Sequence, residues 1–227
     1  MVKYKLVDTE GYTRRGETGE TLWLDGLEKV AFGKGTVLCT ADVIHYYDHP
    51  LLSVLFNPAH ANIQNPRLIE IEIDKSVAHD GLKGGCKKAK YLREIVLPVI
   101  TMEKRIIFAI EMSSKYYIEY YIEDTYKKWA ENWLSGKDRS VAMAVRAESV
   151  ATERAEKEAS VAWRVSSVAS AAAKVASAAA RAARAESAEM AARAVAESAE
   201  MAAMTKNVAE INKLFIETIE KIYQQIT

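Results

Sequence analysis

The chain has 227 residues, and its 31 basic side chains are balanced by 31 acidic ones. This zero net charge gives no whole-chain argument for binding nucleic acid or an anionic membrane. Two cysteines are too few for a disulfide scaffold, and no long apolar run predicts a membrane span. Because no apolar signal segment follows Met1, we expect a cytoplasmic protein, in the host bacterial cytoplasm if a phage encodes it.

The N-terminal part of the chain predicts a mixture of strands and loops. Residues 2–7 alternate loosely between polar and apolar and predict an opening strand. Residues 8–21 carry three glycines among charged residues and predict a loop or hairpin. Residues 42–55 predict a helix that is broken at Pro50.

The clearest strand is 67–73, because Ile69, Ile71 and Ile73 share one face and glutamates the other. Residues 92–100 and 105–112 are two further strand candidates, the first limited to an edge or a strand end by Pro98. From residue 116 to residue 133 the aromatic side chains recur at helical spacing.

A change of composition predicts two domains. All ten glycines lie at or before Gly136 and all four prolines at or before Pro98. These residues interrupt regular structure most strongly, so their loss marks a change of architecture. We therefore expect an α+β, β-rich head at 1–135 and an Ala-rich helical tail at 136–227. Residues 141–204 include 26 alanines, and alanine is the best helix former.

Two periodicities run through the tail. The stretch 185–192 recurs at 196–203, a shift of 11 residues that keeps equivalent side chains on one helix face. Seven small apolar residues before it follow the 4-3 spacing of a heptad seam: Val161, Val165, Val168, Ala172, Val175, Ala179 and Ala182. Small seam residues bury little area each, so a long overlap is needed. The pattern predicts a helical hairpin or a coiled coil.

The last segment, from Val208 to Ile226, is more apolar than the alanine tract and is predicted to be its strongest packing element. A long alanine-rich helix cannot bury one face alone, so we expect a homo-oligomer held by the tail. The residues assigned to self-association are Val165, Val168, Val175, Met190, Met201, Ile211, Phe215, Ile219 and Ile222.

The densest group of potential ligands is the run from His45 to His49, with His60 downstream. On one helix His45 and His49 would share a face, as metal-binding histidines do. The glutamate that a zinc-protease helix needs after its first histidine is missing, and Pro50 ends the helix. We therefore predict no metal site, and polar residues at a helix end.

The stretch 83–90 is basic and is interpreted as a loop that holds a phosphate or an acidic partner, or as a plain solvated loop. Cys86 lies in it next to two lysines that favour a thiolate, so a nucleophile and an exposed loop thiol are both open. The weak ligand candidates are His45, Tyr46, Lys87 and Lys88. The tyrosines and tryptophans of 116–133 are interleaved with acidic residues that repel phosphate, so packing or a protein interface is favoured over nucleic acid.

Four stretches carry a family resemblance: 33–40, 43–47, 69–73 and 92–95. Together with the tail they resemble an uncharacterised family of small phage and prophage proteins, in which a β-rich module carries an Ala-rich helical tail. The order of elements is also similar to that of ADP-ribosyltransferase cores. That pattern places Gly-x-His shortly after the cysteine, whereas Cys39 is followed by Thr40-Ala41-Asp42 and the first histidine is His45. The resemblance implies no established activity and no catalytic glutamate.

We expect an accessory interaction protein of phage type. Its head would recognise a host or phage protein and its tail would drive self-assembly, and the resemblance implies a role in modulating host defence. The alternative is a nucleotide-handling head, ADP-ribosyltransferase-like or ligand-sequestering, on an assembly tail. A third interpretation is a purely structural rod. No catalytic constellation stands out, and we expect no cofactor and no membrane partner.

Overall fold

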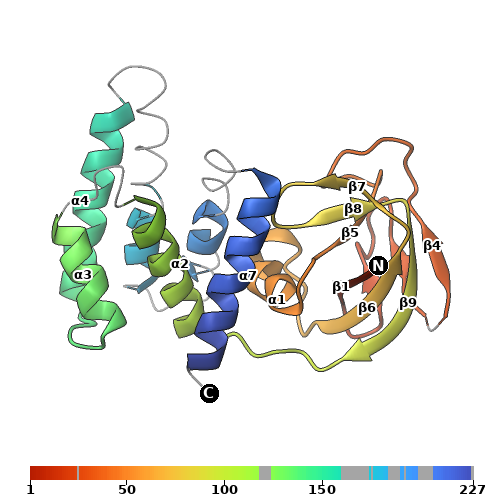
Figure 1. The fold of residues 1–227 in the computed structure, drawn as a ribbon, viewed down its shortest axis with the longest axis horizontal. Coiled ribbons are helices and arrows are strands. Elements are labelled where there is room, and N and C mark those ends of the chain that lie inside the picture. Colours follow the sequence, from red (N-terminus) through yellow and green to blue (C-terminus); the bar gives the residue numbers. More distant parts are fainter. Residues whose placement is uncertain are drawn as a thin grey trace. The chain divides into compact units, whose positions relative to one another are not determined.

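The computed structural model describes residues 1–24, 26–117, 124–159, 174, 176–183, 190–191, 193–198 and 207–225. Its contacts divide the chain into two units (Figure 1). Unit 1 comprises Met1–Val99 and Asn207–Glu217, and unit 2 comprises Ile100–Lys206 and Thr218–Thr227. The α+β class is confirmed, because the sheets are antiparallel and, apart from one helix at Pro50–His60, the helices follow the last strand. The division differs from the expected boundary at 135/136, and the long coiled-coil tail is not confirmed.

Unit 1 is built on antiparallel strands. The first sheet has the order β1 (Val2–Val7), β6 (Arg67–Ile73), β9 (Lys88–Ile95) and β4 (Glu28–Val30). The second has the order β5 (Ile44–Tyr46), β8 (Gly84–Cys86) and β7 (Ser76–His79), and β2 (Tyr12–Thr13) pairs with β3 (Thr21–Leu22). Tyr4 and Tyr47 exchange two backbone hydrogen bonds of 3.0 and 2.8 Å, which join β1 to the segment that follows β5.

The predicted strands at 2–7 and 67–73 and the hairpin within 8–21 are confirmed. Ile69, Ile71 and Ile73 are buried together in the core of unit 1. On the opposite face of β6, Glu70 accepts a 2.7 Å ion-paired hydrogen bond from Arg93 Nε on β9. The alternation of the sequence therefore translates directly into one buried and one polar face.

The helix predicted over 42–55 is wrong. Its first part forms β5, and α1 (Pro50–His60) begins at the proline that was expected to break it. Proline lacks only an N–H that the first turn leaves unpaired, and its φ already suits a helix. His49 caps this end, because its Nδ1 accepts the Leu51 N–H at 3.3 Å.

The loop predicted over 83–90 is also wrong, because Gly84–Cys86 is a buried strand and β9 starts at Lys88. A Cβ at Gly84 would lie 2.1 Å from Cζ of Tyr46. The missing side chain lets the tyrosine ring pack directly on the strand backbone, which a sequence pattern of glycines and lysines does not reveal.

The strand predicted over 105–112 lies within α2 (Met102–Tyr117). Ile106, Ala109, Ile110 and Ser113 are buried at the three- and four-residue spacing of one helix face. Short apolar runs fit strands and helices equally well, which explains the error. The neighbouring candidate, 92–100, is a strand only as far as Ile95, where β9 ends.

Unit 2 is helical in its described parts: α2, α3 (Asp124–Leu134), α4 (Val141–Ala159), residues 176–183 and residues 193–198. Its core combines Tyr126, Trp129 and Trp133 with a large set of buried alanines from α4 and the two later helical segments. Small side chains let helices approach closely, and the two tryptophans fill the space that alanines leave. Tyr126, Trp129 and Trp133 therefore serve packing, but within this helical core and not on the β-rich part, where we expected it.

The helix α7 (Val208–Gln225) begins in unit 1, where it runs beside α1 (Figure 1). The Phe215 ring stacks on Phe56 of α1 with 5.8 Å between centroids. Gly81 has a φ of +94°, and a Cβ there would lie 2.9 Å from the Ile211 Cβ. The contact between the turn that follows β7 and helix α7 therefore depends on a glycine.

The structure buries some of the residues that were assigned to self-association, and others lie outside the described residues. Ile211, Phe215, Ile219 and Ile222 are buried within the single chain, so in this structure they offer no surface to a second copy. The half-buried Met190 packs against the core of unit 2. Val165, Val168, Val175 and Met201 lie outside the described residues.

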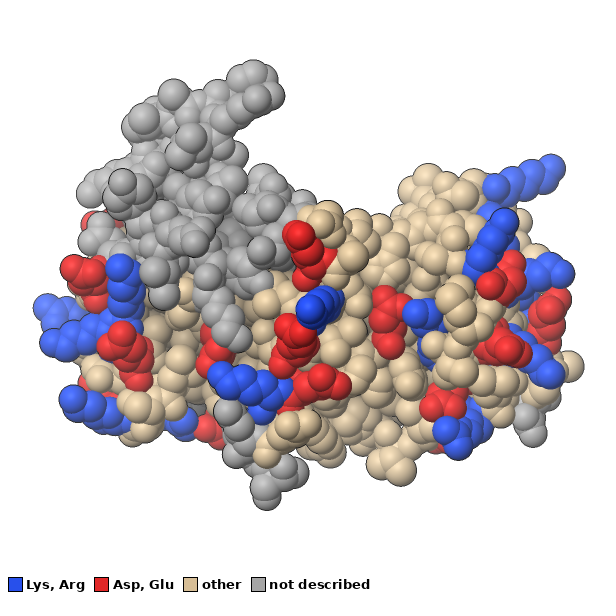
Figure 2. All heavy atoms as spheres, in the orientation of Figure 1, with Lys and Arg blue, Asp and Glu red and all other residues tan. Residues whose placement is uncertain are grey.

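The described surface carries both signs of charge. Figure 2 shows lysine and arginine interspersed with aspartate and glutamate on the visible face, in keeping with the zero net charge. Of the helices that the structure describes, none has the length and hydropathy that crossing a bilayer requires.

Candidate functional site

Unit 1 encloses a cavity of about 310 Å³. Its walls come from β1, the β2–β3 hairpin, the loop between β4 and β5, β5 itself and the end of α1. The volume lies at the lower end of the range for small-molecule pockets. This cavity is the candidate site.

Three cationic side chains line the cavity: Lys5, Arg14 and Lys83. Nη1 of Arg14 is buried without a hydrogen-bond partner among the described residues. The Arg14 Nε lies 3.5 Å from the Glu17 carboxylate, whose side chain is 66% exposed. Glu17 is the one acidic residue in the described lining, so positive charge predominates there.

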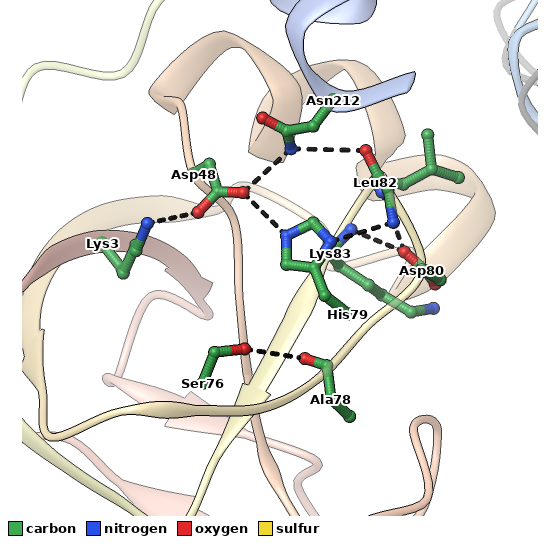
Figure 3. A network of polar contacts seen from close by, with 10 residues as sticks. Lys3, Asp48, Ser76, Ala78, His79, Asp80, Leu82, Lys83 and Asn212 are labelled. Atoms are coloured by element: carbon green, nitrogen blue, oxygen red, sulfur yellow. Dashed lines mark hydrogen bonds and ion pairs between the residues drawn. The ribbon is translucent and has the colours of Figure 1, made fainter. Parts of the chain in front are cut away.

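Lys83 is only 8% exposed. Its position is fixed by its backbone N–H, which donates to Asp80 Oδ1 at 2.9 Å. Figure 3 shows this turn, with hydrogen bonds from the backbone N–H groups of Leu82 and Lys83 to Asp80. Lys83 therefore brings a positive charge to the wall of the cavity.

The charges of these three cations affect the pKa of His45, which also lines the cavity. Burial, and then the charges of Lys5, Lys83 and Arg14, lower the pKa of its imidazole to about 3. All three cations therefore act on one ring that lines the cavity. The ring is neutral, and its Nε2 accepts the Cys39 N–H at 2.7 Å, so the proton resides on Nδ1.

Aromatic rings form other parts of the wall. The Tyr47 hydroxyl is hydrogen-bonded to His60 Nδ1 at 2.9 Å, and the two rings stack with 6.0 Å between centroids. Burial lowers the pKa of His60 to about 4, with the Lys83 charge acting in the same direction. Trp23 donates its indole N–H to Thr13 Oγ1 at 3.1 Å, which holds its ring in place. Flat walls of this kind suit a ring-bearing ligand.

Lys5 projects from β1 into the same cavity. Its Nζ donates to the His45 carbonyl oxygen at 2.9 Å and lies 5.7 Å from the centroid of a Trp23 ring. Burial lowers the pKa of the amine to about 8, helped by the charge of Arg14. Lys5 pairs with no carboxylate among the described residues.

The backbone is strained at two points of the lining. Arg14 and Cys39 have φ angles of 57° and 63°, the left-handed region that non-glycine residues rarely adopt. Both side chains contribute to the cavity. Strain of this kind clusters at ligand sites, where the surrounding structure holds it in place.

Of the four residues predicted to bind a ligand, the structure brings only His45 to the cavity. Tyr46 is buried in the core against Gly84. Lys87 donates to three backbone carbonyls, those of Gly33 at 3.1 Å, Gly35 and Asp42, and so fastens the loop between β4 and β5. Lys88 is on the exposed side of β9, 3.4 Å from Glu28.

Sequence reasoning missed Lys5 and Arg14, and it included Lys83 only as the first residue of the basic stretch 83–90. Nothing distinguishes Lys5 from Lys3 in the sequence, and nothing shows that Arg14 turns inward while Arg15 pairs with Asp8 and Glu10. Lys83 lies in a run of lysines and glycines, and nothing in that run shows which lysine lines a cavity. They are identified only because segments that are distant in the chain place all three side chains around one cavity.

Cys86 is not a reactive thiol. It is fully buried, and burial raises its pKa to about 12. Its Sγ contacts the Ile44 carbonyl oxygen at 3.6 Å. Thiolate chemistry is therefore excluded at this position, and so is the exposed loop thiol that was the other expectation.

Within the described ranges, no group of three or more histidine, cysteine, aspartate or glutamate side chains is placed to hold a metal ion. Comparison of the chain with family models, with curated proteins and with solved structures finds no match. The cavity is therefore interpreted from its own geometry.

Proposed function

We propose that unit 1 binds a small anionic ligand, of the phosphate-bearing class, in the cavity described above. The observation that carries this proposal is the convergence of Lys5, Arg14 and Lys83 on one space that holds a single exposed carboxylate. Without a ligand, the positive charges in this cavity are partly removed from water and lack a counter-charge, which costs free energy. An oxyanion of a ligand would supply that counter-charge and offset this cost.

The individual groups suit such a ligand. The buried Nη1 of Arg14 offers an unused donor, and a guanidinium binds phosphate through two parallel hydrogen bonds. The Lys83 ammonium adds a point charge. The rings of Trp23, Tyr47 and His60 offer surfaces for stacking. This combination favours the nucleotide-handling alternative, as a binding activity and without an assigned reaction.

Thermal unfolding with added ligands tests the proposal. Inorganic phosphate, pyrophosphate, ADP, ADP-ribose and NAD would each be compared with uncharged adenosine. A ligand present at 100 times its Kd stabilises by about 2.7 kcal/mol. We expect stabilisation by at least one phosphate-bearing compound and none by adenosine.

Neighbouring arginines supply a matched pair of variants. Arg14→Gln removes a cavity donor, whereas Arg15→Gln removes a guanidinium that bonds Asp8 and Glu10 outside the lining. The first change should weaken ligand stabilisation at least about tenfold in Kd, equivalent to the roughly 1.4 kcal/mol of one charge-assisted hydrogen bond. Equal effects of both, or no stabilisation by any anion, would refute anion binding at this site.

A second candidate function is recognition of a protein partner by unit 1. Val30 and Phe32 border the cavity and are largely exposed, and Val37 is exposed on the same loop. Exposed apolar side chains beside a pocket are typical of interaction surfaces. A host or phage partner captured by the wild type and lost with Phe32→Ser, while phosphate stabilisation persists, would support this candidate. Loss of both would point to a folding defect.

We propose as well that the chain self-associates through the heptad residues Val165, Val168 and Val175, in the cytoplasm of the cell that produces it. The support is the periodicity of the sequence. Light scattering at micromolar concentration tests it, because a monomer has a mass of 25.3 kDa. A multiple of that mass that falls with Val168→Asp would support assembly, and a mass of one chain would refute it.

A further inference from the structure

Lys5 differs from an ordinary surface lysine in three ways. Its amine faces the cavity, it is held by a carbonyl oxygen and not by a carboxylate, and the Arg14 guanidinium lies near enough to repel its charge. A lysine becomes nucleophilic when burial and a neighbouring cation favour its neutral form. Burial lowers the pKa of this amine to about 8.

We propose that the Lys5 amine forms an imine with the aldehyde group of a small phosphate-bearing ligand in this cavity. The inference rests on the proposed function only for the ligand's phosphate, which Arg14 and Lys83 would hold. The aldehyde chemistry depends on Lys5 alone.

The geometry suits the reaction. A neutral amine that donates one N–H to the His45 carbonyl keeps its lone pair available on another side. That lone pair attacks the aldehyde carbon and forms a C–N bond, and the carbonyl oxygen takes up a proton. The nitrogen gives up one proton in this step, and the carbinolamine then loses its hydroxyl group together with the second nitrogen proton as one molecule of water. One amine and one aldehyde give one imine and one water, and no redox partner is needed.

Lys3 provides an internal control. It lies two positions away on β1 and therefore on the same face of the strand. Its ammonium is ion-paired with the Asp48 carboxylate, whereas the Lys5 amine is held by a carbonyl oxygen. Lys3 is outside the cavity lining. Both residues are lysines on the same face of β1, and they differ in that only Lys5 lines the cavity.

The test uses pyridoxal 5′-phosphate as the probe on the full chain. After reduction with borohydride, any imine becomes a stable secondary amine whose position peptide mass spectrometry identifies. We expect labelling at Lys5 to exceed that at Lys3 by at least about tenfold, because Lys5 lines the cavity that would hold the probe, whereas Lys3 lies outside it and is ion-paired with Asp48. Pyridoxal without phosphate should label Lys5 less, because it lacks the group that Arg14 and Lys83 would bind.

Lys5→Arg retains the positive charge and removes the nucleophile. It should abolish the reducible adduct. Lys3→Arg, outside the cavity lining, is the control that should leave both the Lys5 adduct and stabilisation by inorganic phosphate unchanged. Where this variant fails to fold, the Lys5-to-Lys3 labelling ratio of the wild type decides alone. Labelling spread over exposed lysines, or none at Lys5, would overturn imine formation even if phosphate still stabilises the protein. Labelling at Lys5 with equal efficiency by both probes and no stabilisation by phosphate would uphold the amine chemistry and refute the anion site.

Discussion

The side-chain amide of Asn212 donates a hydrogen bond of 2.9 Å to Oδ2 of Asp48, joining residues 164 positions apart in the chain. The same carboxylate oxygen accepts from His79 Nε2 at 2.7 Å, and Oδ1 is ion-paired with Lys3 (Figure 3). Within unit 1, strand β1, the start of α1, strand β7 and the start of α7 therefore meet at one carboxylate. This is how the C-terminal helix becomes part of a fold that is otherwise built from the first 99 residues.

This network is structural and not catalytic. His79 Nδ1 accepts the Gly81 N–H at 2.9 Å, so its proton is on Nε2 and both ring nitrogens are occupied. Burial raises the pKa of Asp48, but hydrogen bonds from His79 and Lys3 outweigh it and lower that pKa to about 2. The carboxylate therefore stays charged at physiological pH and is a weak base.

Asn212→Ala should loosen the attachment of α7. The change leaves Asp48 with one fewer donor in a partly buried site, and a hydrogen bond to a charged group contributes about 1.5–3 kcal/mol. Lys213→Ala, at the neighbouring exposed position, should cost no more than about 0.5 kcal/mol. Urea unfolding measures both, and hydrogen exchange should show faster opening of residues 207–217 in Asn212→Ala alone. Equal costs would show that Asp48 does not anchor the helix.

Gly84→Ala should destabilise unit 1 severely. The new methyl carbon would lie 2.1 Å from Tyr46 Cζ, so the ring must leave its packed position. Gly16→Ala is the matched control, because that glycine has a φ of +76° with no atom within 4 Å of the added Cβ. The control should cost about 1 kcal/mol of backbone strain, and Gly84→Ala clearly more. Similar melting temperatures for both variants would contradict the packing of Tyr46 on β8.

Overpacking should distinguish the two faces of α4. Ala147 is fully buried and Ala142 is exposed on the same helix. Ala147→Leu should destabilise unit 2 by about 1–3 kcal/mol, because the alanine core leaves no room for three more carbons. Ala142→Leu should be nearly neutral. Denaturation followed by helical dichroism measures the difference, and a neutral Ala147→Leu would mean that the alanine core is loosely packed.

Acid should destabilise the protein through His45 and His60. Their pKa values in the folded chain, about 3 and about 4, are below the ordinary histidine pKa of 6.5. Between those values the unfolded chain binds more protons, so stability is complete above pH 6.5 and is lost as the pH falls toward 4. Each histidine contributes a slope of at most about 1.4 kcal/mol per pH unit.

His60→Gln should reduce this slope by one histidine's share, because glutamine does not titrate. Urea midpoints measured from pH 7 to pH 4.5 provide the data. Asp48 does not contribute to the change measured over this range. Its pKa is lowered, so its stabilising effect is lost only as the pH falls below the ordinary aspartate pKa near 3.8. A midpoint that stays constant over this range would mean that neither ring is desolvated.

Local patterns predicted the parts of the fold in which each residue's environment follows from its neighbours in the chain. The strand at 67–73 is correct because strict alternation leaves one solution, with isoleucines inside. The helical character of 124–134 and 208–225 follows from aromatic and aliphatic side chains at helical spacing. Errors fell where a local signal has two meanings, as with Pro50, which begins a helix as readily as it breaks one.

The sequence by itself therefore determined the α+β class and the strands and helices with strong periodicity. Tertiary structure decided everything that depends on residues distant in the chain. It placed Lys5, Arg14 and Lys83 around one cavity, buried Ile211 and Phe215 against unit 1 instead of leaving them to a second copy, and tied Asn212 to Asp48. The physical reason is that burial and electrostatic field at a residue are set by the side chains that surround it in space. For these residues those side chains come from other strands and helices, about which local spacing carries no information.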